Sequence, residues 1–479
     1  MRVFHYLTET FAINMINLDM KYRQDVSYFK HLSLEMEEVS LAQEVSLPER
    51  TSPEAVRAVW GAFFGFFVDM YDIYLPVVVL PAAIIYFEPK HLSIAVSTTI
   101  YYLVFSVTLI GRPIGAFIFG HYGDRLGRKR TAIIAVGGFG ATTLLMAILP
   151  GYQQWGLGAV IVLTALRLVD GIFLGGEYTA ASPLAMEYSP KLKRGLYGGA
   201  IMSGFPIAYV LISLLTALTF KFAPLGGVHS AFVQWGWRIP FLLGTVISIL
   251  FILYYRSQVP ESELWQKSEK SKSPLSNLFS GDNFKHLVQV FILMSGVWFV
   301  FNSVVDVLPG VLTDVLKISS VTVTNGLLVV NVVLAIGYVL AGVLSQRIGR
   351  RTLFVIFGLL SAIPAPIVYY LLVAHSVANH AVGFLLAGIL EVITISMWGI
   401  VTVYINERFR TAVRASGFGI GYSLAVVIPS FFSFYLLWLA HLMPYKYTQL
   451  VVLILGGVLI LIGALMGPET RDVDFRANG

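Results

Sequence analysis

Six ionisable side chains stand inside long apolar stretches of the first half of the chain. They are Asp69, Asp72, Arg112, Arg167, Asp170 and Glu177. An ionisable residue deep in a membrane-spanning segment is unfavourable, so each one is a candidate functional group. A carboxyl group beside a guanidinium in dry surroundings can exchange a proton, because burial favours its neutral form and the cation favours its charged form. These residue types therefore predict a proton-exchanging site.

The spacing of these residues places them on shared helix faces. At about 100° per residue, Asp69 and Asp72 lie roughly 60° apart around one helix. Arg167, Asp170 and Glu177 fall within an arc of about 80° on another. Each set is expected to point into the interior of a helix bundle.

We predict that Asp72 is the main proton acceptor and that Arg167 is its partner. Asp69 and Glu177 are the further proton-coupling candidates. The alternative for Asp72 and Arg167 is a buried ion pair that only fixes helix packing, and the same alternative exists for Asp69 and Asp170.

Arg112 precedes Pro113 about a dozen residues before a basic turn, too deep to reach water easily. A guanidinium makes paired hydrogen bonds to carboxylate or phosphate, so Arg112 could bind an anionic group of a solute. Pairing with an aspartate of the first helix is the alternative. Arg167, Tyr71 and Tyr178 complete the predicted solute site in this half.

The second half of the chain has fewer polar residues in its apolar stretches. The candidates for hydrogen bonding and stacking with a solute are Asn302, Asp306, Asn331, Glu391 and Trp398. The alternative is that the amides hold helices together and that Trp398 only packs.

The composition indicates a membrane protein, because 57% of residues are hydrophobic and only 13% are charged. A soluble globule of 479 residues needs more polar surface than this. A spanning helix needs about 20 apolar residues, and twelve such stretches occur. They cover about 56–87, 96–121, 131–150, 157–187, 197–220, 237–255, 286–312, 321–345, 352–374, 380–406, 414–440 and 447–467.

Basic residues concentrate in alternate turns between these stretches, which is typical of cytoplasmic loops. With both termini inside, the chain divides into five parts. We predict a cytoplasmic extension over 1–55, a six-helix bundle over 56–255, a cytoplasmic linker over 256–285, a second bundle over 286–467 and a cytoplasmic tail over 468–479.

Three motifs recur in the two halves in the same order. Arg125-Leu-Gly-Arg128 recurs as Arg347-Ile-Gly-Arg350, 222 positions later, and Glu187 with Arg194 recurs as Glu407 with Arg414, 220 positions later. Pro260-Glu-Ser recurs as Pro468-Glu-Thr, 208 positions later. Parallel repeats of this kind place a solute site near the bilayer midplane between two halves that alternate in access.

Acidic residues recur with the basic ones at these inner turns, which favours a charge network that closes the cytoplasmic side. The predicted gate residues are Asp124, Arg125, Arg128, Glu187, Arg194, Arg347, Glu407 and Arg414. The alternative is a solvated turn that only follows the distribution of basic residues.

The segment Gly123-Asp-Arg-Leu-Gly-Arg-Lys-Arg130 resembles the signature of the major facilitator superfamily. Arg112-Pro-Ile-Gly115, Leu174-Gly-Gly-Glu-Tyr178 and Trp235-Gly-Trp-Arg-Ile-Pro-Phe241 resemble its metabolite:proton symporter branch, and the Pro-Glu-Ser/Thr motifs resemble those of sugar porters. The resemblance implies a proton-driven importer of small metabolites, with Asp72 and Arg167 as coupling acid and arginine. It also implies that Glu187, Arg194, Glu407 and Arg414 form the inner gate.

Two departures leave the solute open. The branch usually has Glu-Trp-Tyr-Asp where this chain has Asp69-Met-Tyr-Asp72, and Tyr178 stands where Trp is common. Asp69-Met-Tyr-Asp72 equally resembles the phosphate:proton symporters.

We therefore expect an all-α membrane protein of twelve helices in two pseudo-symmetric bundles, monomeric and in the plasma membrane. Its expected function is proton-coupled import of a small organic anion or sugar-like solute. A phosphate:proton symporter and a non-transporting nutrient sensor are the alternatives. An enzyme is disfavoured because no catalytic spacing appears in the spans. No cofactor, metal or nucleic acid is expected, and the absence of cysteine excludes disulfides and thiolate sites.

Overall fold

The computed structural model describes residues 51–89, 94–267, 274–375 and 379–475. The predicted extension over 1–55 therefore lies outside the described residues except for its last five positions. Residues 51–479 form one compact unit, and the description below concerns this unit.

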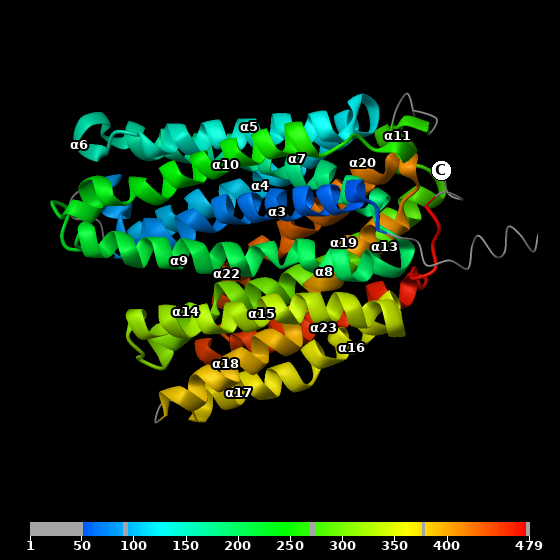
Figure 1. Cartoon of the computed structure of the whole chain (residues 1–479). Coiled ribbons are helices and arrows are strands. Elements are labelled where there is room, and N and C mark those ends of the chain that lie inside the picture. Colours follow the sequence, from blue (N-terminus) through cyan, green and yellow to red (C-terminus); the bar gives the residue numbers. More distant parts are fainter. Residues whose placement is uncertain (1–50, 90–93, 268–273, 376–378, 476–479) are drawn as a thin grey trace, which may run out of the picture. The chain divides into compact units, whose positions relative to one another are not determined.

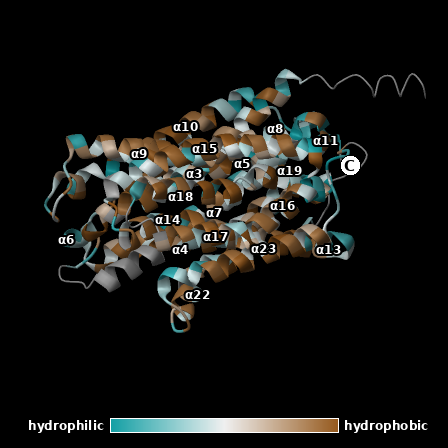
Figure 2. Ribbon diagram, turned by 90° about the horizontal axis from the view of Figure 1, so that it is seen from below, coloured by the Kyte–Doolittle hydropathy of each residue, from teal (hydrophilic) through white to brown (hydrophobic). Residues whose placement is uncertain are grey.

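The described part of the chain is built from helices, and no strand occurs in those ranges (Figure 1). Twelve of its helical segments are long and apolar enough to cross a membrane. Apolar residues run along the lengths of the helices, and hydrophilic ones gather in the connections at their ends (Figure 2). This distribution matches a bundle surrounded by lipid.

The N-terminal half, defined as α3 to α10, supplies six of these segments. Its helices are α3 Pro53–Val79, α4 Ile94–Leu126, α5 Arg128–Ala147, α6 Tyr152–Trp155, α7 Leu157–Tyr188, α8 Arg194–Met202, α9 Gly204–Phe222 and α10 Arg238–Gln258. The short α6 lies between spans, and α8 and α9 together form the fifth span, Lys191–Phe222.

The C-terminal half, defined as α13 to α23, supplies the other six. Its helices are α13 Gly281–Phe301, α14 Leu308–Gly310, α15 Ser320–Ile348, α16 Arg350–Ala362, α17 Pro364–His375, α18 His380–Ile395, α19 Trp398–Arg408, α20 Arg414–Ser423, α21 Val427–Ser430, α22 Phe432–Leu439 and α23 Thr448–Met466. Short 3-10 or π-helical turns join several of these into single spans. Two short helices, α11 Glu263–Lys267 and α12 Pro274–Leu278, lie between the halves.

The observed helix ends differ from the predicted ones by a few residues. α3 begins at Pro53, where the Ser52 hydroxyl accepts a hydrogen bond from the Ala55 amide at 3.1 Å. It ends at Val79 rather than near residue 87, since Pro81 has no amide hydrogen to continue the ladder. α10 ends at Gln258 and α13 begins at Gly281. The segment between the halves is therefore shorter than the predicted 256–285.

Glycines let α4 and α7 approach closely and so position the charged residues that these helices carry. A Cβ built on Gly115 would lie 1.8 Å from the Ile172 carbonyl oxygen, and one on Gly171 would lie 2.1 Å from the Thr108 carbonyl oxygen. Gly111 and Gly115 of α4, like Gly171 and Gly175 of α7, are four residues apart, a spacing that lets membrane helices pack closely.

The two halves also meet through glycines. A Cβ on Gly342 of α15 would lie 2.2 Å from the carbonyl oxygen of Gly195 on α8. A Cβ on Gly195 would lie 2.3 Å from the Gly342 carbonyl oxygen. This backbone contact between halves leaves no room for a side chain at either position.

Candidate functional site

Asp72, Arg167 and Asp170 form a buried group inside the N-terminal half, the Arg167 cluster. The Arg167 Nη1 lies 3.3 Å from Asp72 Oδ2 and 2.8 Å from Asp170 Oδ2. The side chains of Thr142 and Thr143 on α5 donate hydrogen bonds to Asp170 and Asp72, the first at 2.7 Å. The predicted Asp72–Arg167 pairing is therefore present, and the two threonines are partners that the sequence did not indicate.

Asp69, Arg112 and Glu177 form a second buried group, the Arg112 cluster. The Arg112 Nη2 donates to Asp69 Oδ2 at 3.1 Å, as the packing alternative for Arg112 expects. The Arg112 Cζ also lies 5.7 Å from the ring centroid of Tyr422 on α20, in the other half. Asp69 and Asp72 share a face of α3 but bind arginines of different helices.

Glu177 belongs to the Arg112 cluster through proximity to its charges. Gly175, two residues before it on α7, packs against the Arg112 backbone, where a Cβ would lie 2.2 Å from the Arg112 carbonyl oxygen. Its carboxyl group is fully buried, and neither oxygen has a hydrogen-bond partner among the described residues. The carboxyl packs against Gly65 of α3, where a Cβ would lie 1.9 Å from Oε1.

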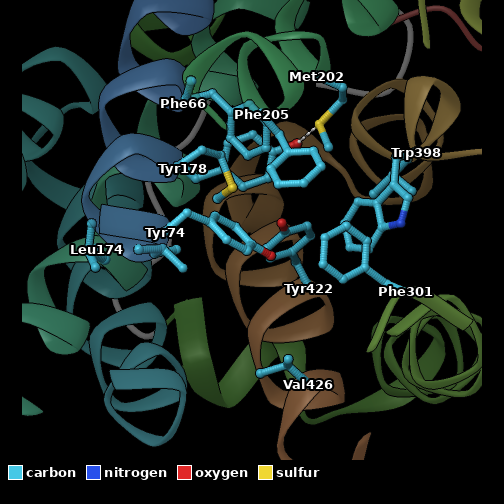
Figure 3. Close-up of a cluster of buried hydrophobic side chains, with 14 of the residues drawn as sticks. Phe66, Tyr74, Leu174, Tyr178, Met202, Phe205, Phe301, Trp398, Tyr422 and Val426 are labelled. Atoms are coloured by element: carbon cyan, nitrogen blue, oxygen red, sulfur yellow. Dashed lines mark hydrogen bonds between the residues drawn. The ribbon is translucent and has the colours of Figure 1, made fainter. Parts of the chain in front are cut away.

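An aromatic cluster lies where the two halves face each other (Figure 3). Tyr178 stacks edge-on with Phe418 and Tyr422, with ring centroids 4.8 and 4.9 Å apart, and Phe205 contacts Phe301 at 5.3 Å. The Tyr178 hydroxyl donates to Met202 Sδ at 2.8 Å. Rings from both halves thus adjoin the Arg112 cluster through Tyr422.

Trp398 lies in this aromatic cluster as well. Its ring is 4.6 Å from that of Trp298 and 5.1 Å from that of Phe301, and its indole nitrogen has no hydrogen-bond partner among the described residues. An indole N–H without a partner in a buried aromatic site can donate a hydrogen bond to a ligand.

The other predicted residues of the second half have varied surroundings. The Asn331 side chain donates to the Leu327 carbonyl of its own helix at 2.9 Å, which fits the packing alternative. Asn302 and Glu391 are buried and Asp306 is half-buried. Tyr209 of the N-terminal half lies within electrostatic range of both Glu391 and Asp306.

Tyr71 lies in a different place from the other predicted solute contacts. Its hydroxyl donates to the Pro240 carbonyl at 2.9 Å, and its ring contacts Gly244 of α10. Tyr71 thus packs within the N-terminal half, about 100° around α3 from Asp72.

The repeated motifs meet at one end of the helices, here called the linker face. It is the end at which Thr51, Arg128, Glu187, Arg350, Glu407 and Phe475 lie, and it carries the C-terminal mark in Figure 1. In the N-terminal half, Arg128 Nη1 lies 2.5 Å from Glu187 Oε1, and Arg414 of the other half binds the same carboxylate.

The C-terminal half repeats this arrangement. Arg350 Nε lies 3.3 Å from Glu407 Oε2, and Arg194 of the other half approaches Glu407 at 4.0 Å. Each glutamate therefore takes one arginine from its own half and one from the other, and these side chains are buried. A purely solvated turn does not fit this burial.

The third repeated motif caps the helices that start with the basic residues. Glu261 accepts the Arg128 amide at 3.1 Å, and Glu469 accepts the Arg350 amide at 2.7 Å. Each capped helix follows a glycine with positive φ, namely Gly127 at 111° or Gly349 at 101°. A Cβ is disfavoured at this φ, which explains glycine there.

Asp124 joins the halves directly. Its carboxylate accepts the amides of Ala415 and Ser416 at 3.1 and 2.9 Å and the Ser416 hydroxyl at 2.7 Å. Because α20 begins at Arg414, the carboxylate caps the start of a helix of the other half.

Two predicted gate residues, Arg125 and Arg347, are not part of this buried network. Both are exposed; Arg125 contacts His121 at 3.3 Å, and the Arg347 carbonyl accepts from Arg471 at 2.9 Å. In the C-terminal half, Arg350 instead of Arg347 makes the buried ion pair with Glu407. The repeat contained this signal, since Arg350 follows Arg128 by 222 positions.

The described end of the tail packs into the linker face, which the sequence did not indicate. Phe475 is 2% exposed, and its ring centroid lies 3.7 Å from the Arg194 Cζ and 4.0 Å from the Arg414 Cζ. Arg194 Nη1 also donates to the Val473 carbonyl at 2.7 Å. The Phe475 ring thus makes a cation–π contact with one arginine from each half.

Comparison with known proteins identifies the family of this chain. The profile of the Major Facilitator Superfamily matches residues 62–433. The chain belongs to the Major Facilitator Superfamily. This Major Facilitator Superfamily protein is a multi-pass membrane transporter, not an enzyme.

Several characterised proteins are similar to this Major Facilitator Superfamily transporter. The shikimate transporter of Escherichia coli is 29% identical over 396 residues, covering 78% of this chain and 85% of its own. The proline/betaine transporter of Salmonella typhimurium is 27% identical over 394 residues, covering 77% and 74%. The structure of the proton:xylose symporter XylE superposes with a TM-score of 0.72 at 19% identity, over 88% of this chain and 99% of the other. The last similarity establishes the fold.

Proposed function

We propose that this transporter is a proton-coupled symporter that imports a small organic anion by alternating access. The observation that carries the proposal is the Arg167 cluster, in which a carboxyl group of the first span is buried against one arginine and a second carboxyl. Two carboxylates against a single cation favour uptake of a proton. Asp72 is the proposed coupling acid, with Arg167 as its partner.

The proposed solute site lies between the halves, beside the Arg112 cluster and the aromatic cluster. Arg112 offers a guanidinium to a carboxylate of the solute, and the Trp398 indole N–H offers a hydrogen bond from the other half. Tyr178 and Tyr422 supply flat apolar surface for a ring or a hydroxylated carbon skeleton. Asn302 is the remaining polar candidate, because its side-chain nitrogen has no partner in the described part of the chain.

The linker face is the proposed inner gate. The ion pairs of Glu187 and Glu407 connect the two halves, so they must break before a solute can leave through that face. The basic residues concentrated there support a cytoplasmic orientation of the linker face, with both termini inside and the plasma membrane as location. We propose that one chain is the transporting unit, because the two halves in one chain form both sides of the site.

A zwitterionic solute is the second candidate. Asp306 and Glu391 lie in the half opposite Arg112, and the same half carries the edge-on rings of Trp298 and Trp398. A cationic group of a solute would fit beside aromatic faces and carboxylates. The similarity to a proline/betaine transporter agrees with this candidate.

A thermal-shift screen of the detergent-solubilised protein would select the ligand, since ligand binding to the folded state raises apparent stability. The panel is shikimate, proline, glycine betaine, xylose and inorganic phosphate. Stabilisation by phosphate alone would replace the organic-anion proposal with a phosphate symporter.

Uptake of the selected ligand into proteoliposomes would then test coupling. We expect an inward proton gradient to drive accumulation of the ligand by the wild type. Asp72→Asn should lose this accumulation but still exchange labelled for unlabelled ligand. Full accumulation by Asp72→Asn would exclude Asp72 as the coupling acid. Binding without flux under any gradient would identify a sensor.

A further inference from the structure

The Arg167 cluster contains more negative than positive charge when all its groups are ionised. Asp72 and Asp170 share one guanidinium, and the charged groups that act on Asp170 are those of Asp72 and Arg167. A buried charge without a counter-charge is strongly unfavourable, so one of the two carboxyl groups must retain a proton. This is the proton site already proposed.

The Arg112 cluster has the same imbalance. Asp69 takes one Nη of Arg112, while Glu177 has no hydrogen-bond partner for either oxygen within the described ranges. All three residues are at most 1% exposed. The group thus holds one guanidinium and two carboxyl groups, all three buried, and the guanidinium binds only the Asp69 carboxylate among them.

Among the described residues, the ionisable groups around Glu177 include one cation, Arg112. The ionisable neighbours from the surrounding helices are Asp69 on α3, Arg112 on α4, Tyr178 on α7 itself, Tyr255 on α10 and Tyr422 on α20. The Glu177 carboxyl also packs against Gly65 of α3. Arg112 is therefore the only positive charge among these neighbours.

We propose that the Arg112 cluster is a second proton-binding site, in which Asp69 and Glu177 share one proton while the linker face is closed. The N-terminal half then holds two protons in this conformation, one in each cluster. This inference deepens the proposed symport and rests on it for its role in transport.

The two sites differ in what they contact. The Arg167 cluster is enclosed by α3, α5 and α7 of its own half. The Arg112 cluster touches Tyr422 of the other half, so a movement of the halves changes its surroundings directly. A solute carboxylate that replaces Asp69 on Arg112 adds another negative charge, which a further proton must neutralise. The second site thus links binding of the anion to uptake of a proton.

Infrared difference spectroscopy between acid and alkaline pH would test the second site without any solute. The carbonyl stretch of a protonated carboxyl group is separate from that of a carboxylate, and deuterium exchange confirms its origin. The samples are the full-length protein in liposomes and the variants Glu177→Gln, Asp69→Asn and Asp72→Asn. Asp306 and Glu391 of the other half are unchanged in all samples, so any band that they contribute serves as an internal reference.

We expect Glu177→Gln and Asp69→Asn to lose the same protonated-carboxyl band, because either variant leaves one carboxylate for Arg112. Asp72→Asn should lose a different band, and Glu263→Gln, which removes an exposed carboxylate, should lose neither. If both Glu177→Gln and Asp69→Asn retain every band of the wild type, the second site does not exist. Two independent variants guard against misfolding of one, and Gln at 177 removes no hydrogen bond.

The outcomes separate this inference from the proposed function. Wild-type bands in both variants, together with proton-driven uptake that depends on Asp72, would reject the second site and leave symport intact. Loss of the shared band without any proton-driven uptake would retain the site and reject symport.

Discussion

The guanidinium of Arg194 stacks on the ring of Phe475, with its Cζ 3.7 Å from the ring centroid. Arg414 of the other half lies over the same ring at 4.0 Å. Six residues after the Glu469 helix cap, the tail therefore bridges the two halves where their ion pairs meet. This contact makes the tail part of the closed linker face.

Phe475→Ala should favour opening of the linker face by about fivefold, since a cation–π contact contributes about 1 kcal/mol. The chain has no cysteine, so a single thiol introduced by Ser182→Cys, at a buried position, would report the opening. Its rate of modification by a membrane-impermeant maleimide should rise in the Phe475→Ala background. Phe475→Tyr keeps the ring and is the control; equal rates in all backgrounds would contradict the contribution of the ring.

Glu187 and Arg414 should show strong energetic coupling, because both are buried and Glu187→Gln leaves Arg414 and Arg128 without the carboxylate that they share. We expect each of Glu187→Gln and Arg414→Gln to destabilise the closed protein by roughly 3 kcal/mol, and the double variant by much less than the sum. Thermal unfolding in detergent of the wild type, the two single variants and the double variant would measure this coupling as a double-mutant cycle. The exposed pair Glu263 and Lys267, 3.7 Å apart, is the control, with expected coupling of about 0.5 kcal/mol or less.

Gly342→Ala should separate the halves at the linker face, because its Cβ would lie 2.2 Å from the Gly195 carbonyl oxygen. We expect a lower unfolding temperature and greater exposure of the thiol at position 182. Gly388→Ala is the matched control in the same half, since the nearest atom to its Cβ, Val330 Cγ2, lies at an ordinary 3.6 Å. Similar effects of the two substitutions would argue against a specific close contact of the halves.

Arg112→Lys should weaken binding of an anionic ligand by about tenfold or more, because lysine keeps the charge and loses the paired donors of the guanidinium. Isothermal titration with the ligand selected in the thermal-shift screen would measure this. Arg238→Lys is the control, since Arg238 donates to the Tyr86 hydroxyl at 2.8 Å and the Leu149 carbonyl at 3.0 Å near the start of α10. Unchanged affinity in Arg112→Lys would remove Arg112 from the solute site.

The helical membrane architecture and the candidate charged residues could be predicted from the sequence. Hydropathy over about 20 residues is a local property, so the twelve spans followed from composition along the chain. The pairing of Asp72 with Arg167 was also predictable, because few counter-charges exist in the apolar stretches.

The partner of each buried charge could not be predicted from the sequence and became known from the packing of the helices. Asp69 and Asp72 are three residues apart, yet the 60° between them is enough to direct one to Arg112 of α4 and the other to Arg167 of α7. Likewise, Glu187 takes Arg414 of the opposite half, although Arg194 is near in sequence. The pseudo-symmetric apposition of two bundles sets these partners, and local sequence holds no information on how two distant helices are placed around each other.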